Sequence, residues 1–332
     1  MEENKYDVIV VGGGPVGLAC AIEVIKTHHK VIVLEKGALA ESIRRYPFQM
    51  TFFSTAENIA IGDVPFTINK PKATREEALN YYRKAAEIWN VPVALYNKVT
   101  SITKKNSKFK IDTENGRSYV SDYCIISTGY FDFPRKLNIP GEDLPNVRHY
   151  YDEPFRYARQ KVVMAGGGNS AIEAALDLFR HGVKVTMVVR KEVLKPTAKY
   201  WLLPDILNRI KAGDIEVLYN HELKSIEKGH VKAANLVENK KVSIDADFVL
   251  ILTGYEPDVK FLEECGIQID PESLSPTFNS NSYETNIENL YVAGTVTAGI
   301  HTEKVFIENG REHAKLIASD IQKKSKKIPQ VN

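Results

Sequence analysis

Short apolar runs, each followed by a glycine-rich turn and a helical pattern, dominate the hydrophobic profile of the chain. Residues 8–11 predict a strand, residues 15–27 a helix, and residues 31–34 a second strand. Strands that are apolar at every position are typical of parallel sheets covered on both faces. The same order returns over residues 161–189 at nearly the same spacing. The profile therefore predicts an internal repeat of a nucleotide-binding unit.

The segments around these units predict further elements. Residues 75–90 form an amphipathic pattern, with a capping box that begins at Thr74. Residues 91–129 read as an antiparallel meander that ends in Thr-Gly, whereas residues 37–75 have no clear periodicity. Residues 302–318 are expected to form a helix that is broken locally by Asn309-Gly310. Hairpins or strands are expected over residues 215–246, 247–254 and 289–294, and a helix within residues 196–211.

Composition narrows the class of protein. The chain has 332 residues, which suggests two domains, and a net charge of +2 with the charges interspersed, which favours neither nucleic acid nor a membrane surface as partner. The cysteines Cys20, Cys124 and Cys265 are widely spaced, which fits a reducing cytoplasm and predicts no metal site. No run of about 18 apolar residues suggests a membrane span, and residues 8–22 lack the basic start of a signal peptide.

The first glycine motif predicts a dinucleotide site. Gly12, Gly14 and Gly17 form Gly-x-Gly-x-x-Gly between a strand and a helix. The glycines permit a tight turn, close approach of a pyrophosphate and close packing of the helix, whose N-terminus favours phosphate. Glu35 ends the second strand, where a carboxylate accepts hydrogen bonds from ribose hydroxyls and repels a 2′-phosphate. This site is expected to prefer a nucleotide with free ribose hydroxyls.

The second motif ends differently. Gly166, Gly168 and Ala171 form Gly-x-Gly-x-x-Ala, but the following strand ends at Arg190 and Lys191. Cations at this position suit the 2′-phosphate of NADP. The second site is therefore expected to prefer NADPH over NADH.

Taken together, these motifs make the whole chain similar to the thioredoxin-reductase-like flavoproteins, and most similar to the bacillithiol disulfide reductase (YpdA-type) family. The resemblance implies an α/β fold of two Rossmann-like, three-layer ββα domains. It implies an FAD-binding domain over residues 1–131 and 254–332, interrupted by an NADPH-binding domain over residues 132–253. Its less generic strings are residues 49–55, 61–64, 149–151, 199–201, 204–205 and 306–311.

The resemblance implies both cofactors, FAD at the first unit and NADPH at the second. With the motifs, it assigns FAD to Gly12, Gly14, Pro15, Val16, Gly17, Glu35, Lys36, Val99, Thr128, Gly129, Gly294, Thr295 and Lys304. It assigns NADPH to Gly166, Gly168, Asn169, Ser170, Arg190 and Lys191. The implied activity is hydride transfer from NADPH to FAD and on to a low-molecular-weight thiol disulfide. A homodimer, with hinges near residues 130–135 and 252–257, is also implied.

Two departures from the related families affect the chemistry. Thioredoxin reductases carry Cys-x-x-Cys before the second nucleotide strand, whereas residues 149–152 here contain no cysteine. In the bacillithiol-reductase family the residue before the third glycine is often a cysteine, and here it is Val16. A valine cannot form a mixed disulfide. Cys20, one helical turn further on, is the remaining thiol candidate, and His149 and His301 are candidate proton donors.

Other functions stay open at this stage. A ferredoxin- or flavodoxin-NADP reductase of the same architecture needs no protein cysteine, although residues 323–332 lack the aromatic extension usual in those enzymes. The motif of flavin monooxygenases has no counterpart between the two units. A non-catalytic NADPH/FAD sensor is a further alternative. The expected partner is therefore a small-molecule disulfide or a small redox protein.

Overall fold

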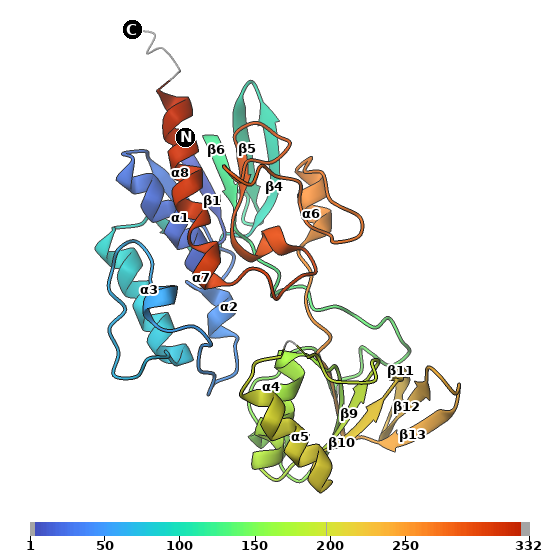
Figure 1. Cartoon of the computed structure of the whole chain (residues 1–332). Coiled ribbons are helices and arrows are strands. Elements are labelled where there is room, and N and C mark those ends of the chain that lie inside the picture. The colour runs from blue at the N-terminus through green and yellow to red at the C-terminus, as the bar shows by residue number, and fades with distance from the viewer. Residues whose placement is uncertain (1–3, 197, 327–332) are drawn as a thin grey trace. The chain divides into compact units, whose positions relative to one another are not determined.

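The chain folds into two compact units joined by two short crossings. The computed structural model describes residues 4–196 and 198–326. Unit 1 comprises Met1–Phe133 and Tyr255–Asn332, and unit 2 comprises Pro134–Gly254 (Figure 1). The predicted inserted domain spans residues 132–253. The mixed α/β, Rossmann-like fold class is confirmed.

Unit 1 is built on a seven-stranded sheet with the order β3-β2-β1-β6-β5-β4, and β15 also pairs with β6. The four strands β3, β2, β1 and β6 run parallel, as does β15 on β6, whereas β4, β5 and β6 form an antiparallel meander. The strands are β1 (Asn4–Val11), β2 (Val31–Leu34), β3 (Val93–Ala94), β4 (Val99–Lys105), β5 (Lys108–Thr113), β6 (Ser118–Ile126) and β15 (Leu290–Val292).

Alternate residues of β1 face two different cores. Val8 and Val10 belong to the core on the side of the long helices, whereas Ile9 and Val11 belong to the core shared with the meander. Burial on both faces explains why this strand is apolar at every position. The helical elements of unit 1 are α1 (Pro15–Lys26), α2 (Glu41–Arg44), η1 (Glu57–Ile59), α3 (Arg75–Ile88), α6 (Val259–Glu264), η3 (Gly294–Ala298), α7 (Ile307–Gly310) and α8 (His313–Ser325).

Unit 2 repeats the three layers. A parallel sheet with the order β10-β9-β8-β14-β7 has α4 and α5 on one face and a separate antiparallel sheet, β11-β12-β13, on the other (Figure 1). Val162 and Met164 face the helices, whereas Val163 and Ala165 face the small sheet. The elements are β7 (Val147–Arg148), η2 (Phe155–Tyr157), β8 (Lys161–Ala165), α4 (Asn169–Arg180), β9 (Lys184–Val189), α5 (Leu202–Ala212), β10 (Glu216–Tyr219), β11 (His221–Glu227), β12 (His230–Asn235), β13 (Lys241–Asp245) and β14 (Phe248–Ile251).

Two local predictions were wrong. β3 does not open the meander but pairs in parallel with β2, since its short sequence carries no signal of its partner. The helix expected over residues 302–318 begins only at Ile307 and continues to Ser325, although the expected break at Asn309-Gly310 is found where α7 ends. The segment 37–75 is largely irregular, as expected, and contains the short helical turns α2 and η1.

The crossings between the units run alongside each other. The N–H of Glu256 donates to the carbonyl of Phe133 at 2.9 Å, and the N–H of Arg135 donates to the carbonyl of Gly254 at 3.0 Å. The hydroxyl of Thr253 donates to the Arg135 carbonyl at 2.9 Å. Backbone pairing therefore holds the entry and the exit of unit 2 together.

The capping box of α3 provides a test of the fold. The Glu77 N–H donates to the Thr74 hydroxyl at 3.2 Å, and the Thr74 N–H donates to the Glu77 carboxylate at 2.8 Å. We expect Thr74→Ala to lower the free energy of unfolding by about 1 kcal/mol in denaturant titrations, since the helix loses a cap. Thr67→Ala, at an exposed site, is the control. Equal losses in both variants would contradict the capping role.

Candidate cofactor-binding and active site

The first glycine loop allows α1 to pack directly on β1. A Cβ on Gly17 would lie 2.0 Å from the carbonyl oxygen of Gly12, and a Cβ on Gly12 would lie 2.5 Å from the carbonyl oxygen of Ser127. Gly12 also has a φ of +108°, which other residues rarely adopt. Side chains at either position are therefore excluded by backbone atoms.

Gly14 is different, because the space beside it is open. A Cβ on Gly14 would meet no atom within 4 Å, and this residue is the N-cap of α1 without a side-chain cap. The first N–H groups of a helix have no partner within the helix, and together with the helix dipole they favour an anion. The loop therefore has both the room and the polarity for a phosphate group.

Glu35 lies at the end of β2 with its carboxylate against this loop. It is 5% exposed, and its carboxylate accepts the N–H of Gly13 at 2.6 Å and the N–H of Gly37 at 2.8 Å. Burial raises the pKa of Glu35, although these backbone hydrogen bonds oppose the rise. A carboxylate oxygen has more than one lone pair, so hydroxyl donors can still bind.

Residues distant in sequence gather at the same edge of the sheet. Thr128 and Gly129 follow β6, and a Cβ on Gly129 would lie 3.1 Å from the hydroxyl of Thr295 at the start of η3. The buried Thr128 hydroxyl has no hydrogen-bond partner within the described part of the chain. Buried polar atoms without a partner are uncommon. The orphaned hydroxyl and the open space at Gly14 both fit a bound dinucleotide.

Val16 fills a slot lined by two glycines. Its side chain lies 3.1 Å from the Cβ position of Gly294 and 3.2 Å from that of Gly310, and it is 6% exposed. The position between the second and third glycines therefore contributes packing between α1, η3 and α7. It offers no redox chemistry, because valine has no reactive group.

Unit 2 presents a second loop of the same kind. A Cβ on Gly166 would lie 2.4 Å from the carbonyl oxygen of Leu252, whereas a Cβ on Gly168 would meet nothing within 4 Å. Gly168 is the N-cap of α4, again without a side-chain cap. At the end of β9, Arg190 and Lys191 are exposed. This loop can also receive a phosphate group, and cations follow its second strand in place of a carboxylate.

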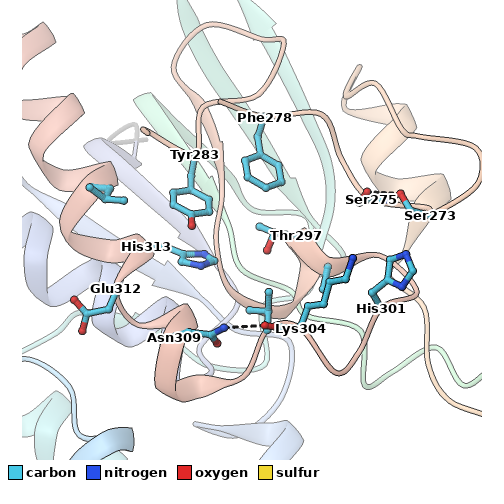
Figure 2. A pocket seen from close by; sticks show the side chains of 13 residues that line it. Ser273, Ser275, Phe278, Tyr283, Thr297, His301, Lys304, Asn309, Glu312 and His313 are labelled. Atoms are coloured by element: carbon cyan, nitrogen blue, oxygen red, sulfur yellow. Dashed lines mark hydrogen bonds between the residues drawn. The ribbon is translucent and has the colours of Figure 1, made fainter. Parts of the chain in front are cut away.

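The remaining residues predicted to bind a cofactor lie at several places in the two units. Lys36 forms an ion pair with Asp132, and Val99 begins β4. The Asn169 side-chain oxygen accepts the N–H of Lys199 at 2.9 Å, while Ser170 is exposed. Lys304 lines a cavity in unit 1 (Figure 2). Pro15 occupies the first turn of α1, where its missing N–H costs no hydrogen bond.

All three cysteines are buried and unpaired. Cys20 and Cys124 are 0% exposed and Cys265 is 9% exposed. Burial raises the pKa of the Cys20 thiol and of the Cys124 thiol well above the ordinary range, and that of Cys265 to about 12. Because the thiolate is the reactive form, none of these groups is prepared for disulfide exchange at neutral pH.

The two candidate histidines have different surroundings. His149, in unit 2, lies 3.5 Å from the buried carboxylate of Glu142, and its Nδ1 has no partner among the described residues. Burial lowers the pKa of His149. His301, in unit 1, is partly exposed and lies 3.8 Å from Glu303. Neither histidine belongs to a cluster with a cysteine.

A buried histidine that the sequence analysis did not select lies beside the first site. His313, at the start of α8, accepts the N–H of Gly294 at its Nδ1, 3.2 Å away. The two residues are 19 positions apart and no motif links them, so this contact could not be predicted from the sequence.

The chain matches a known protein family over most of its length. Residues 9–294 match the family model described as pyridine nucleotide-disulphide oxidoreductase. The chain belongs to this family. It is therefore an oxidoreductase, and the family and its thioredoxin-reductase-like relatives use FAD and NADPH.

Individual relatives narrow the resemblance within the family. The chain is 40% identical to bacilliredoxin reductase Bdr of Bacillus subtilis, over 95% of this chain and 97% of that protein. It superimposes on bacillithiol disulfide reductase Bdr (YpdA) of Bacillus cereus with a TM-score of 0.94 and 37% identity, over 96% and 99% of the two chains. It is 26% identical to ferredoxin–NADP reductase of Ignicoccus hospitalis, over 88% of this chain and 90% of that protein. The predicted resemblance to the YpdA-type family is confirmed.

Residues 4–196 and 198–326, which the structure describes, contain no helix that is long and apolar enough to cross a membrane. They also contain no group of three or more His, Cys, Asp or Glu side chains that could hold a metal ion.

The burial of the cysteines predicts their reactivity. We expect Ellman's reagent at about pH 8 to label less than one thiol per native, flavin-loaded chain, because the thiols are both inaccessible and protonated. All three cysteines should react in denaturant. Thr67→Cys, which places a thiol at an exposed position, should add one rapidly labelled group. Rapid labelling of the native wild-type protein would show that a cysteine is accessible after all.

Proposed function

We propose that the chain is an FAD-dependent NADPH oxidoreductase that reduces the disulfide of a low-molecular-weight thiol, with bacillithiol disulfide as the first candidate. The observation that carries the two-cofactor assignment is the contrast between the two loops. The first is followed by the buried carboxylate of Glu35 and the second by the exposed cations Arg190 and Lys191. The choice of substrate is supported by the Bacillus relatives, which are named for bacilliredoxin and bacillithiol disulfide.

In this proposal, each unit orients one cofactor. The N-terminus of α1 and Glu35 bind the pyrophosphate and a ribose of FAD, and Thr128 donates or accepts a hydrogen bond beside them. The N-terminus of α4 binds the pyrophosphate of NADPH, and Arg190 pairs with its 2′-phosphate. When bound, FAD supplies two-electron transfer between NADPH and the acceptor. The net reaction consumes one NADPH, one proton and one disulfide, and releases NADP⁺ and two thiols.

The protein's own thiols take no part in the proposed reaction. Cys20, Cys124 and Cys265 are buried, and Val16 stands where relatives often have a cysteine. Bound FAD would therefore supply the reducing electrons without a protein thiol as carrier. His301, which is partly exposed, is the candidate proton donor to a departing thiolate. We further propose a cytoplasmic location, because unpaired cysteines fit a reducing compartment. The resemblance to the thioredoxin-reductase-like flavoproteins is the support for a homodimer.

A second candidate is a ferredoxin- or flavodoxin-NADP reductase. The Ignicoccus relative is named as one, and single-electron transfer to a redox protein needs no cysteine. Stopped-flow measurement of which acceptor reoxidises the flavin separates this candidate from the disulfide reductase. A non-catalytic sensor would show no multiple turnover with any acceptor.

Anaerobic stopped-flow absorbance tests the acceptor. We expect NADPH to bleach the flavin faster than NADH does, and bacillithiol disulfide to restore its colour over repeated turnovers. Reoxidation by ferredoxin or flavodoxin alone would instead favour the electron-transfer enzyme. Cys20→Ala should leave turnover within about twofold of wild type, since its thiol is not used. Loss of turnover in a variant that keeps its flavin would contradict the thiol-free route.

Arg190 provides the test of cofactor choice. We expect Arg190→Gln to lower kcat/KM for NADPH by about tenfold or more, because a charge-assisted hydrogen bond is lost. The value for NADH should stay nearly unchanged, since NADH has no 2′-phosphate. Lys184→Gln, at the other end of β9, is the matched control. An equal fall for both nucleotides would mean that Arg190 does not select the phosphate.

A further inference from the structure

One carboxylate attaches the crossing that leaves β6 to two other segments of unit 1. Asp132 lies on this crossing, and its side chain is 17% exposed. Its Oδ2 forms an ion pair with the ammonium group of Lys36, and its Oδ1 accepts a hydrogen bond from Arg45 Nη1 at 2.5 Å. Lys36 follows β2 and Arg45 follows α2. Asp132 therefore joins three segments that are far apart or differently folded in the chain.

Aromatic contacts reinforce the same attachment. The ring of Phe131 packs edge-on against that of Tyr46, with centroids 5.0 Å apart, and the Arg45 guanidinium group lies 5.3 Å from the Phe131 centroid. The returning crossing is attached here as well, because the Tyr255 ring lies 5.2 Å from Phe131 and 5.9 Å from Tyr130. Aromatic and cation–π pairs at these separations are attractive. Both crossings are thus fixed to unit 1 beside Asp132.

This attachment lies next to the proposed flavin site without being part of its phosphate-binding loop. Lys36 directly follows Glu35, whose carboxylate accepts two backbone N–H groups and does not contact Asp132. At the other side, Asp132 is four residues beyond Thr128, whose buried hydroxyl was assigned to the cofactor. A change of charge at Asp132 should therefore loosen the crossing while the groups assigned to FAD keep their own hydrogen bonds.

We propose that Asp132 is a positioning residue for hydride transfer, which acts by holding Lys36 and Arg45 and so fixing the crossing to unit 1. The inference rests on the proposed function, because the hydride that NADPH loses on becoming NADP⁺ must reach a flavin held by the other unit. Residues 130–133 connect the two units, so their position affects how often the reacting atoms approach each other. Misplacement by about 1 Å is enough to slow a reaction about a hundredfold.

Hydrogen–deuterium exchange of the flavin-loaded protein tests the attachment without any turnover. The backbone N–H groups of Phe133, Arg135 and Glu256 are hydrogen-bonded at the crossings. We expect Asp132→Asn, which removes the charge and keeps the size, to speed exchange of these three groups by about tenfold, since charged hydrogen bonds are lost. Asp122→Asn is the matched control, because Asp122 forms an ion pair with Lys108 on β6, away from the crossings. It should leave this exchange unchanged.

Anaerobic stopped-flow absorbance tests the consequence for the reaction. We expect Asp132→Asn to slow bleaching of the flavin by saturating NADPH by about tenfold or more. Bleaching by dithionite, which needs no nucleotide, should keep the wild-type rate, and the flavin content and the KM for NADPH should also be unchanged. Asp132→Glu, which retains the charge, should keep more of the NADPH rate than Asp132→Asn. Asp122→Asn should react as the wild type does.

A double-mutant cycle with Lys36→Gln tests whether the ion pair is the cause. Lys36→Gln alone should slow bleaching by NADPH and speed exchange at the crossings, but should add little to Asp132→Asn. The proposal is wrong if Lys36→Gln instead weakens flavin binding equally in both backgrounds, since Lys36 would then bind FAD directly. If Asp132→Asn does not fold, Lys36→Gln and Asp132→Glu provide the same two readouts.

Unchanged exchange in Asp132→Asn, or an equal rise in Asp122→Asn, would also overturn the role of Asp132. Equal slowing of the NADPH and dithionite reactions would show that the substitution damages the flavin site itself, which contradicts a positioning role. A wild-type flavin that NADPH does not bleach would instead refute the proposed function. The exchange measurements would still decide whether Asp132 holds the crossing, so the two failures can be told apart.

Discussion

The absence of a side chain at Gly17 is the constraint on which the first site depends. Any Cβ there would overlap the carbonyl oxygen of Gly12, so only glycine lets α1 approach β1 closely enough to point its N-terminus at the turn. Unit 2 repeats the contact of the first glycine: a Cβ on Gly166 would meet the carbonyl of Leu252, as one on Gly12 would meet that of Ser127, whereas Ala171 stands at the third position. In both units a backbone–backbone contact, and not a polar side chain, positions the groups that face a phosphate. Neighbouring residues are then free to differ, and Glu35 and Arg190 give the two loops opposite charge.

Local signals predicted most of the fold. The apolar strands, the capping box at Thr74 and both glycine loops could be read from the sequence because each depends on residues within about one turn or one strand. The glycines of each loop could likewise be placed together, since their spacing puts them in one strand–helix turn. Val16 was noted as a departure, but its contacts with Gly294 and Gly310 come from chain segments almost 300 residues away.

Features that depend on distant partners could not be predicted. β3 joins β2 in parallel although nothing in two residues specifies that pairing. Lys36 follows Glu35 directly, yet its ammonium group forms an ion pair with Asp132, almost a hundred residues later. His313 was included in a predicted helix, but its neutral state and its bond to Gly294 follow only from burial in the folded protein. Each is an effect of tertiary packing, which periodicity does not encode.

The insertion of unit 2 has a consequence for synthesis on the ribosome. Unit 1 cannot complete its sheet until β15 arrives to pair with β6, and its core lacks Ile317 and Ile321 until α8 is made. Unit 2 is complete at Gly254, and its ends are held by backbone hydrogen bonds at the crossings. Domains generally fold as units during translation. The inserted unit can therefore fold first. Its two ends, held side by side, then bring the two halves of unit 1 close enough to fold together.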